Sequence, residues 1–321
     1  MAVKTAIITG ITGQDGAYLA ALLNEKGYRV IGLVRSYHTI NTKGLKYLGI
    51  DEQIELVECD LADLSQVLAT IKHYDPLEIY NLAAQSSVSL SFKQPIGTIQ
   101  YNVVSVLNML EAIRMINPLI KFYQASSSEV FGDSELPIKE TTYINPISPY
   151  SISKASAHWI TKNYRDSYGL FSCSGFLFNH ESYLRSDNFF VKKVILQSIK
   201  IKKGLAKTLE VGNIDIKRDF GWAPKYVEAM YLMLQQDSPE DFLICSNQSV
   251  TLRSVIEYVF NYLGVGMECL IIDEKLFRPT EILDIYGDNT KAREKLGWTY
   301  DTSFFDVLKI LIDEELANEG A

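Results

Sequence analysis

The sequence of 321 residues is poor in the features that define several protein classes. Its four cysteines, Cys59, Cys173, Cys245 and Cys269, are scattered and form no C-x-x-C pair. This is typical of a reducing cytoplasm and argues against a disulfide scaffold. The four histidines are equally dispersed, so their spacing predicts no metal site.

Long apolar runs and an excess of positive charge are absent as well. No apolar run approaches the ~20 residues of a membrane-spanning helix, and the first residues lack the pattern of a secretory signal. The chain has 31 Lys and Arg against 39 Asp and Glu, a formal net charge of -8. Sequence-independent nucleic-acid binding needs a basic surface. We therefore expect a cytoplasmic protein that binds neither membrane nor nucleic acid, while a local Arg and Lys cluster still suits an anionic small substrate.

Short apolar runs alternate with segments of helical periodicity along the first half of the chain. The predicted strands are Lys4–Thr9, Arg29–Val34, Ile54–Cys59, Glu78–Leu82, Lys121–Ala125 and Ser172–Phe178. The predicted helices are Ala17–Lys26, Leu64–His73, Thr98–Ile116 and Ser151–Tyr168. The alternation predicts an α/β fold with a Rossmann-type, doubly wound parallel sheet, which binds its ligand outside the carboxyl ends of the strands.

The alternation breaks down after about Leu177, where the loops lengthen and basic segments appear at Lys192–Lys207 and Lys217–Arg218. We therefore predict two domains. Residues 1–177 form the Rossmann domain, and residues 178–321 form mainly a smaller, mixed α/β substrate domain. A segment at about 211–235 is expected to return to the first domain.

A glycine-rich run follows the first predicted strand and opens the first helix. Gly10 permits a tight turn, Gly13 allows the backbone to approach a pyrophosphate, and Gly16 allows the helix to pack closely on the sheet. The helix N-terminus then faces the phosphates of a dinucleotide. The candidate cofactor residues of this run are Gly10, Thr12, Gly13, Gln14, Asp15 and Gly16.

The ends of the next strands supply further cofactor candidates. The second strand ends in Arg35 and Ser36 with no carboxylate, a pattern that favours NADP over NAD because Arg accommodates a 2′-phosphate. Asp60 and Leu61 end the third strand, where the adenine is expected. The fourth strand ends in small residues that let the backbone approach the cofactor; the candidates there are Leu82, Ala84, Gln85 and Ser86.

Tyr150 and Lys154 are four residues apart and therefore share one helix face. An ammonium beside a phenol lowers its pKa, which makes Tyr150 a candidate base near neutral pH. The fifth strand ends near Ser127, whose hydroxyl is placed to bind a sugar hydroxyl next to Tyr150. Oxidation of an alcohol needs only these three groups, so Glu129 adds a second acid/base. Both the phenol and the ammonium are also expected to contact the cofactor.

Taken together, these motifs resemble those of GDP-mannose 4,6-dehydratases of the short bacterial form, within the extended short-chain dehydrogenase/reductase superfamily. The resemblance runs almost from end to end. It is carried by Gly10–Gly16, Tyr80–Ser86, Phe122–Ser126, Leu177–Ser182, Lys217–Asp219, Tyr226–Met230, Arg278–Glu281 and Lys295–Trp298.

The resemblance implies a lyase reaction with no net redox change. Tyr150 would take the proton of the 4-hydroxyl while hydride passes from C4 to NADP, with NAD as the alternative cofactor. Glu129 would then remove the C5 proton, and Glu129 or Ser128 would help water to leave from C6, to which the hydride returns. The implied cofactor contacts are His180 and Arg185, and the implied GDP-sugar contacts are Ser87, Asn179, Asn188, Lys193, Arg218, Arg278 and Glu281.

Several positions depart from the family pattern. Ser127 replaces a threonine, and the second-strand loop has one arginine, Arg35, where the family has two. The resemblance implies a homodimer or a homotetramer. In the family this loop reaches a neighbouring subunit, so its departure here weakens the expected tetramer contact. Other departures lie on the substrate side and leave the sugar open between mannose, an N-acetylhexosamine and a heptose; they are Ser186, Asp187, Phe220 and Lys225.

Two other functions remain compatible with the motifs. A GDP-sugar 4-epimerase or 4-oxidoreductase of the same superfamily would use Tyr150 and Lys154 and leave Glu129 idle. A cofactor-binding regulator without turnover would not need the catalytic residues at all.

Overall fold

Seven parallel strands form the central sheet of the computed structural model, which describes residues 3–318. The sequence order of the strands reverses between β1 and β4, so the sheet is doubly wound and the predicted fold class is confirmed. In spatial order the strands are β11 (Phe242–Ile244), β6 (Ser172–Leu177), β5 (Lys121–Ser127), β4 (Glu78–Asn81), β1 (Thr5–Thr9), β2 (Arg29–Val34) and β3 (Glu55–Glu58).

Helices cover both faces of the sheet because apolar side chains alternate along each strand. On β1, Ala6 and Ile8 pack against one layer and Ile7 against the other. One layer contains α1 (Gln14–Glu25), α2 (Lys43–Tyr47) and α8 (Ala223–Leu234). The other contains α3 (Leu64–Tyr74), α5 (Pro95–Ile116) and α6 (Pro149–Tyr168), with α4 (Val88–Lys93) before α5.

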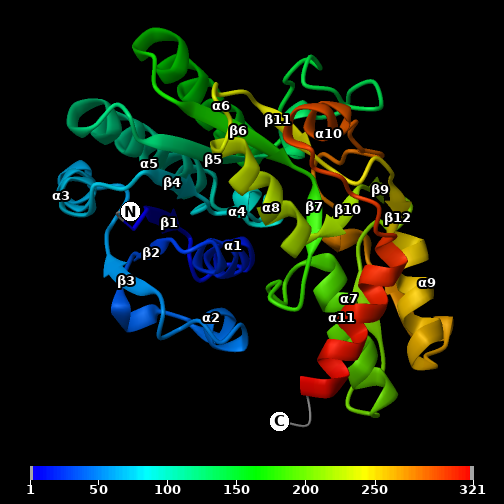
Figure 1. Cartoon of the computed structure of the whole chain (residues 1–321). Coiled ribbons are helices and arrows are strands. Elements are labelled where there is room, and N and C mark those ends of the chain that lie inside the picture. The colour runs from blue at the N-terminus through cyan, green and yellow to red at the C-terminus, as the bar shows by residue number, and fades with distance from the viewer. Residues whose placement is uncertain (1–2, 319–321) are drawn as a thin grey trace.

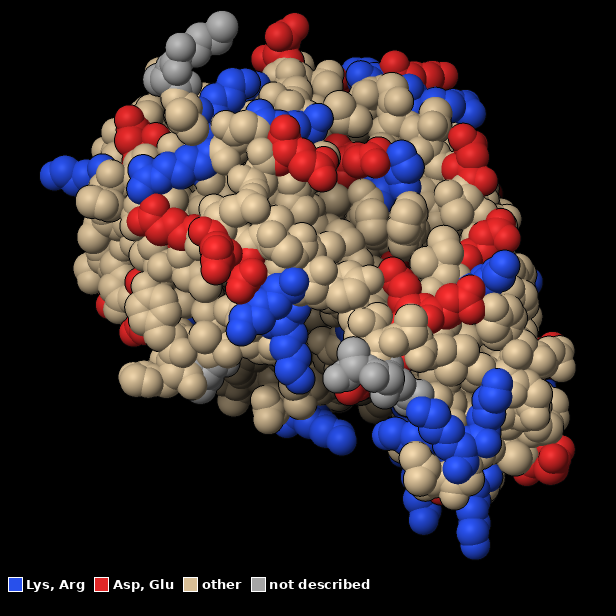
Figure 2. Space-filling view, turned by 60° about the horizontal axis from the view of Figure 1, so that its bottom comes forward, with Lys and Arg blue, Asp and Glu red and all other residues tan. Residues whose placement is uncertain are grey.

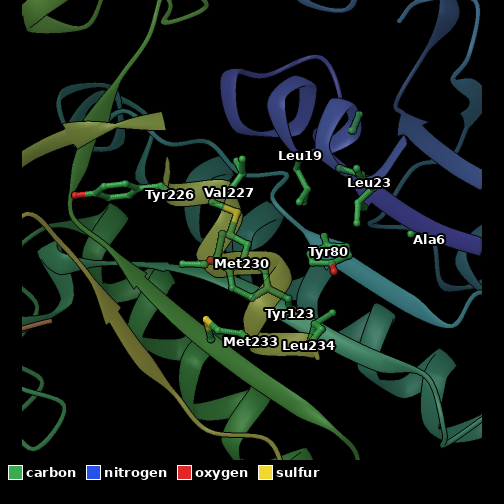
Figure 3. Packing of buried hydrophobic residues seen from close by; sticks show 14 of the residues in the cluster. Ala6, Leu19, Leu23, Tyr80, Tyr123, Tyr226, Val227, Met230, Met233 and Leu234 are labelled. Carbon is green, nitrogen blue, oxygen red and sulfur yellow. The ribbon is translucent and has the colours of Figure 1, made fainter. Parts of the chain in front are cut away.

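The first layer joins segments that are far apart in the sequence. Leu19 and Leu23 of α1 face Met230 and Leu234 of α8 over the buried ring of Tyr80 (Figure 3). Helix α8 therefore completes the cover of a sheet whose first six strands end at Leu177. Helix α8 lies within the segment at about 211–235 that was expected to return to the first domain. Strand β11 and helix α10 (Thr290–Leu296) lie outside that segment.

A smaller unit lies beside the carboxyl ends of the strands (Figure 1). Its apolar core lies between α7 (Phe190–Lys202), α9 (Leu252–Leu263) and α11 (Phe304–Asn318). Three two-stranded sheets connect these helices to the cavity described below. They pair β7 (Asn179–Glu181) with β10 (Phe220–Trp222), β9 (Lys217–Arg218) with β12 (Val250–Thr251), and β8 (Leu209–Val211) with β13 (Leu270–Ile272).

Candidate active site

Two connected cavities lie at the carboxyl ends of the strands, where the strand order reverses. The larger has a volume of about 700 Å³ and the smaller about 500 Å³. They share Gly10, Thr12, Ala84 and Tyr101 among their lining residues. A doubly wound sheet places its ligand at this position. In Figure 2, basic side chains border the gap between the main body and the smaller lobe at the lower right.

The glycine turn after β1 is closed by backbone contacts that exclude larger residues. Gly10 has a φ of +70°, and a Cβ there would lie 2.9 Å from the Ala83 backbone nitrogen. A Cβ on Gly16 would lie 2.3 Å from the Gly10 carbonyl oxygen. No side chain caps α1, which begins after Gly13, so the first N–H groups of the helix remain available to an anion. These features fit a dinucleotide diphosphate.

The smaller cavity extends from the glycine turn over the ends of β2 and β3. It is lined by Arg35, Ser36, Leu61 and Gln85, as expected for the adenosine end of a dinucleotide. Asp60 lines neither cavity, which differs from the prediction. Its carboxylate accepts the N–H of Ala62 at 3.0 Å in a local turn.

Tyr150 and Lys154 lie on the cavity side of α6, one helical turn apart, and both line the larger cavity. The helix is capped by Ser148, whose hydroxyl accepts the Ser151 N–H in a capping box. Lys154 Nζ donates a hydrogen bond to the Ala125 carbonyl oxygen at 2.8 Å. Burial lowers the pKa of Lys154 to about 8.

The phenol of Tyr150 does not have the lowered pKa that the helical pairing predicted. Burial raises the pKa of Tyr150 to about 12, against a lowering effect of the hydrogen bond with Ser127. The Lys154 ammonium is directed at the Ala125 carbonyl and does not offset this desolvation. The protein therefore holds the phenol in its protonated form, and further positive charge is needed beside it before it accepts a proton.

Ser127 and Glu129 line the same cavity at the end of β5. The Ser127 hydroxyl accepts the Glu129 N–H at 3.3 Å, which begins the 3₁₀ turn Ser128–Phe131. Ser128 is buried and lines neither cavity, contrary to the role predicted for it. Successive side chains of a 3₁₀ turn point about 120° apart, so Ser128 cannot share the direction of Glu129.

The far end of the larger cavity carries two arginines that share one carboxylate. Arg218 Nη2 donates to Glu281 Oε1 at 2.8 Å, and Arg278 Nη1 lies 3.3 Å from the same oxygen. Burial lowers the pKa of Arg218, and the charges of Glu129 and Glu281 raise it again. The two guanidinium groups leave a net positive charge that suits a diphosphate.

Most of the other predicted residues also face the larger cavity. The ammonium of Lys193 donates to the Glu210 carbonyl oxygen at 2.7 Å, which fixes it at the rim. Arg185 lies over the Phe189 ring and 3.4 Å from the Glu181 carboxylate. The predicted residues that line this cavity, in addition to those above, are Leu82, Ser86, Ser87, Gln14, Asp15, Asn179, His180 and Asn188.

Sequence reasoning missed a set of lining residues from the smaller unit and from α5. Tyr101 lies where the two cavities meet, on a helix that carries no motif. The apolar wall of the larger cavity comes from separate loops with no shared signal, and it includes Val211, Gly212, Ile216, Leu252 and Leu276. Within residues 3–318, no three His, Cys, Asp or Glu side chains cluster as metal ligands would. Over the same range no helix is long and apolar enough to cross a membrane.

The chain is similar to known proteins over almost its whole length. The family model described as GDP-mannose 4,6 dehydratase matches residues 7–311. GDP-mannose 4,6 dehydratase 1 of Arabidopsis thaliana is 44% identical, over 98% of this chain and 90% of the relative. GDP-mannose 4,6-dehydratase of Vibrio cholerae is 39% identical, over 98% of this chain and 94% of the relative.

Solved structures share the fold at lower identity. A UDP-glucose 4-epimerase from Thermotoga maritima, crystallised with UDP-glucose, aligns with a TM-score of 0.87 and 22% identity over 98% of this chain and 99% of the other. A dTDP-glucose 4,6-dehydratase from Streptomyces venezuelae, with NAD and TYD bound, aligns with a TM-score of 0.87 and 20% identity over 98% of both chains. At this identity the likeness establishes the architecture alone.

Proposed function

The chain belongs to the GDP-mannose 4,6-dehydratase family, and from this membership we propose that it converts GDP-mannose to GDP-4-keto-6-deoxymannose and water with the residues that line the larger cavity. It is accordingly an enzyme of the 4,6-dehydratase, or lyase, class. A 4-epimerase or 4-oxidoreductase activity is not favoured, since the relatives at 38–44% identity are named as dehydratases. The observation that carries the proposal is that Glu129 shares one cavity with Tyr150, Lys154 and Ser127.

A nicotinamide dinucleotide is the proposed cofactor, with its diphosphate at the N-terminus of α1 and its adenosine in the smaller cavity. NADP is proposed in preference to NAD because Arg35 lines that cavity and no carboxylate ends β2. When bound there, the nicotinamide would supply a reversible hydride acceptor, so that the reaction would have no net redox change.

The residues of the chain supply the proton chemistry of the proposed reaction. Tyr150 accepts the proton of the 4-hydroxyl, with Ser127 hydrogen-bonded to the phenol. The hydrogen bond with Ser127 and the charge of Arg185 favour the phenolate against the burial that raises its pKa. Because a buried phenol resists ionisation, this proton transfer is expected to occur only when the site is closed around both ligands.

Glu129 removes the C5 proton once C4 is a ketone. The carbonyl acidifies this proton, and the carboxylate then passes it to the hydroxyl that leaves from C6 as water. C5 takes a proton from solvent in its place, which balances the proton that Tyr150 accepted from the 4-hydroxyl and releases. Arg218 and Arg278 bind the diphosphate of the substrate, and Glu281 holds the two guanidinium groups in place. Ser128 is given no role here, since it faces neither cavity.

Substitution of Glu129 by glutamine separates dehydration from oxidation. Glu129→Gln keeps the side-chain volume and cannot accept the C5 proton, so turnover is expected to fall by roughly a hundred- to ten-thousand-fold. The variant should stop with reduced cofactor and a 4-keto sugar bound, which is followed by the absorbance of the reduced nicotinamide. The control is Glu135→Gln, an exposed carboxylate of the following loop, which should leave the rate unchanged.

The wild-type protein must meet a separate condition in the same assay. Incubation with GDP-mannose in deuterated water should release one water per sugar and place deuterium at C5. If the sugar keeps its mass and only the configuration at C4 changes, the dehydratase proposal is wrong. A panel with GDP-linked N-acetylhexosamine and heptose tests whether mannose is the preferred sugar.

We also propose that the protein assembles as a homodimer or homotetramer. Apolar side chains are exposed on the outer face of α5 and α6, which pack side by side. They include Leu107, Met115, Ile152 and Trp159, with Trp159 52% exposed. An exposed apolar patch of this kind marks an interface. Light scattering during size-exclusion chromatography gives the mass, and a monomer would contradict the proposal.

A further inference from the structure

Two side chains of the first turn of α1 hold the segment that contains β7. Gln14 Nε2 donates to the His180 carbonyl oxygen at 3.1 Å, and Gln14 Oε1 accepts the Ser182 hydroxyl at 2.8 Å. The next residue, Asp15, has both carboxylate oxygens 2.9 Å from His180 Nε2. The turn proposed to bind the dinucleotide is thus bonded directly to the segment whose Asn179 lines the substrate end of the cavity.

The hydrogen-bond partners of both His180 ring nitrogens are acceptors. Nδ1 lies 2.7 Å from the carbonyl oxygen of Phe178, which only accepts, so Nδ1 carries a proton. Nε2 faces the Asp15 carboxylate. Burial raises the pKa of Asp15, but the charge and hydrogen bond of His180 outweigh it and the net pKa is lowered. An ionised carboxylate also only accepts, so both ring nitrogens of His180 lie against acceptors and are placed to donate.

The surroundings of the pair keep it in place. The Tyr226 ring from α8 stacks on the His180 ring at 4.6 Å, and His180 is only 6% exposed. Other charged groups that act on the pair include Glu181, Arg185 and Lys154. Gly221 lies opposite His180 on the paired strand β10, where the Tyr226 ring fills the space that a Cβ would take.

The contact between His180 and Asp15 affects the electrostatics of the proposed diphosphate site. The N-terminus of a helix attracts a diphosphate, but a lone carboxylate in its first turn repels it. His180 cancels the charge of Asp15, so the turn keeps its attraction for the diphosphate. A dinucleotide that orders this turn also orders β7 through the same pair, since the two segments share three side-chain contacts.

We propose that the Asp15–His180 ion pair couples the two halves of the site, so that a bound dinucleotide raises the affinity for the nucleoside diphosphate of the substrate. The proposal rests on the proposed function for the identity of the two ligands. Asp15 and His180 act here as positioning residues, and the coupling is reciprocal by thermodynamic necessity.

Calorimetric titration measures the coupling directly, with GDP and NADPH as the probes. In the native protein, saturating NADPH should lower the dissociation constant of GDP on the order of tenfold. In Asp15→Asn the factor should fall toward one. Glu25→Gln removes the same charge from the exposed far end of α1 and should keep the native factor. The proposal would be overturned if NADPH lowered the dissociation constant of GDP as much in Asp15→Asn as in the native protein, or if it had no effect on that constant in the native protein.

The charge state of His180 is tested by ¹H–¹⁵N correlation of the imidazole nitrogens, with His180→Gln to assign the signals. Both ring nitrogens should carry a proton in the native protein, because each lies against an acceptor. Asp15→Asn should lose this signature while remaining folded. A neutral ring in the native protein would refute the ion pair.

The two proposals fail in different ways. Binding of GDP and NADPH requires no turnover, so a chain that shows the coupling but dehydrates no GDP-sugar would contradict only the proposed function. An active dehydratase whose GDP affinity does not respond to NADPH would contradict only the coupling.

Discussion

Asp219 should make the stability of the protein depend on pH in an unusual direction. It follows Arg218 and is fully buried. Its Oδ1 accepts the N–H and the hydroxyl of Ser246 at 2.9 and 2.7 Å, and its Oδ2 accepts the Gly287 N–H at 3.3 Å. These hydrogen bonds favour the carboxylate, but burial outweighs them and raises the pKa of Asp219 to about 7.

The sign of the effect follows from the proton count of the two states. Between the ordinary pKa of 3.8 and about 7, the folded carboxyl holds a proton that the unfolded chain has released. The contribution of Asp219 to the free energy of unfolding is therefore largest below the pKa of the unfolded chain. This contribution is lost as the pH rises through about 7. At 1.36 kcal/mol per pKa unit, the loss between pH 5 and pH 8 is about 2.5 kcal/mol.

Urea unfolding at the two pH values tests this, with Asp219→Asn beside the native protein. Other groups titrate equally in both proteins. The loss of unfolding free energy between pH 5 and pH 8 therefore differs between the native protein and the variant only by the contribution of Asp219. The variant should lose about 2.5 kcal/mol less than the native protein on going from pH 5 to pH 8. Asp237→Asn, at an exposed position, should keep the native loss. Equal losses in Asp219→Asn and the native protein would refute the argument that this carboxyl is protonated in the fold.

Three further substitutions test the proposed base, the cofactor preference and the packing around Tyr226. Tyr150→Phe should lower turnover by at least about a hundredfold, since only the phenol proton acceptor is lost, while NADPH titration gives native affinity; retained turnover would exclude Tyr150 as the base. Arg35→Ala should weaken NADPH binding more than NADH binding in parallel titrations, and an equal loss for both would remove the argument for NADP. Gly221→Ala places a Cβ 2.2 Å from the Tyr226 ring and should cost about 1–3 kcal/mol in thermal unfolding. Gly97→Ala, where nothing lies within 4 Å, should not destabilise, and equal effects would refute the contact argument.

The regular part of the fold was predictable because its physics is local. Six strands of the sheet lie within two residues of the predicted ranges, since short apolar runs between helical segments suit a parallel sheet that is buried on both faces. The glycine turn was placed because Gly10 and Gly16 meet steric demands that no other residue meets. Tyr150 and Lys154 were found because helix geometry puts them on one face.

The rest depends on contacts between distant segments, which leave no periodic signal. Strand β11 has three residues, too few to show a period, and joins the sheet by pairing with β6. The carboxylate of Glu281 meets Arg218 across 63 residues, and His180 meets Asp15 across 165. The raised pKa of Tyr150 follows from burial, which only the packed structure reveals.

The position of β11 late in the sequence affects folding during translation. Strand β6 ends at Leu177 and is therefore synthesised and released well before β11, which ends at Ile244. Until then the outer edge of β6 presents backbone groups without a partner strand, and such edges pair readily with other chains. Helix α8, which covers one face of the sheet, is also synthesised after β6. Codon changes that slow translation between Leu177 and Ile244 would prolong this exposure and promote aggregation without altering a single native contact.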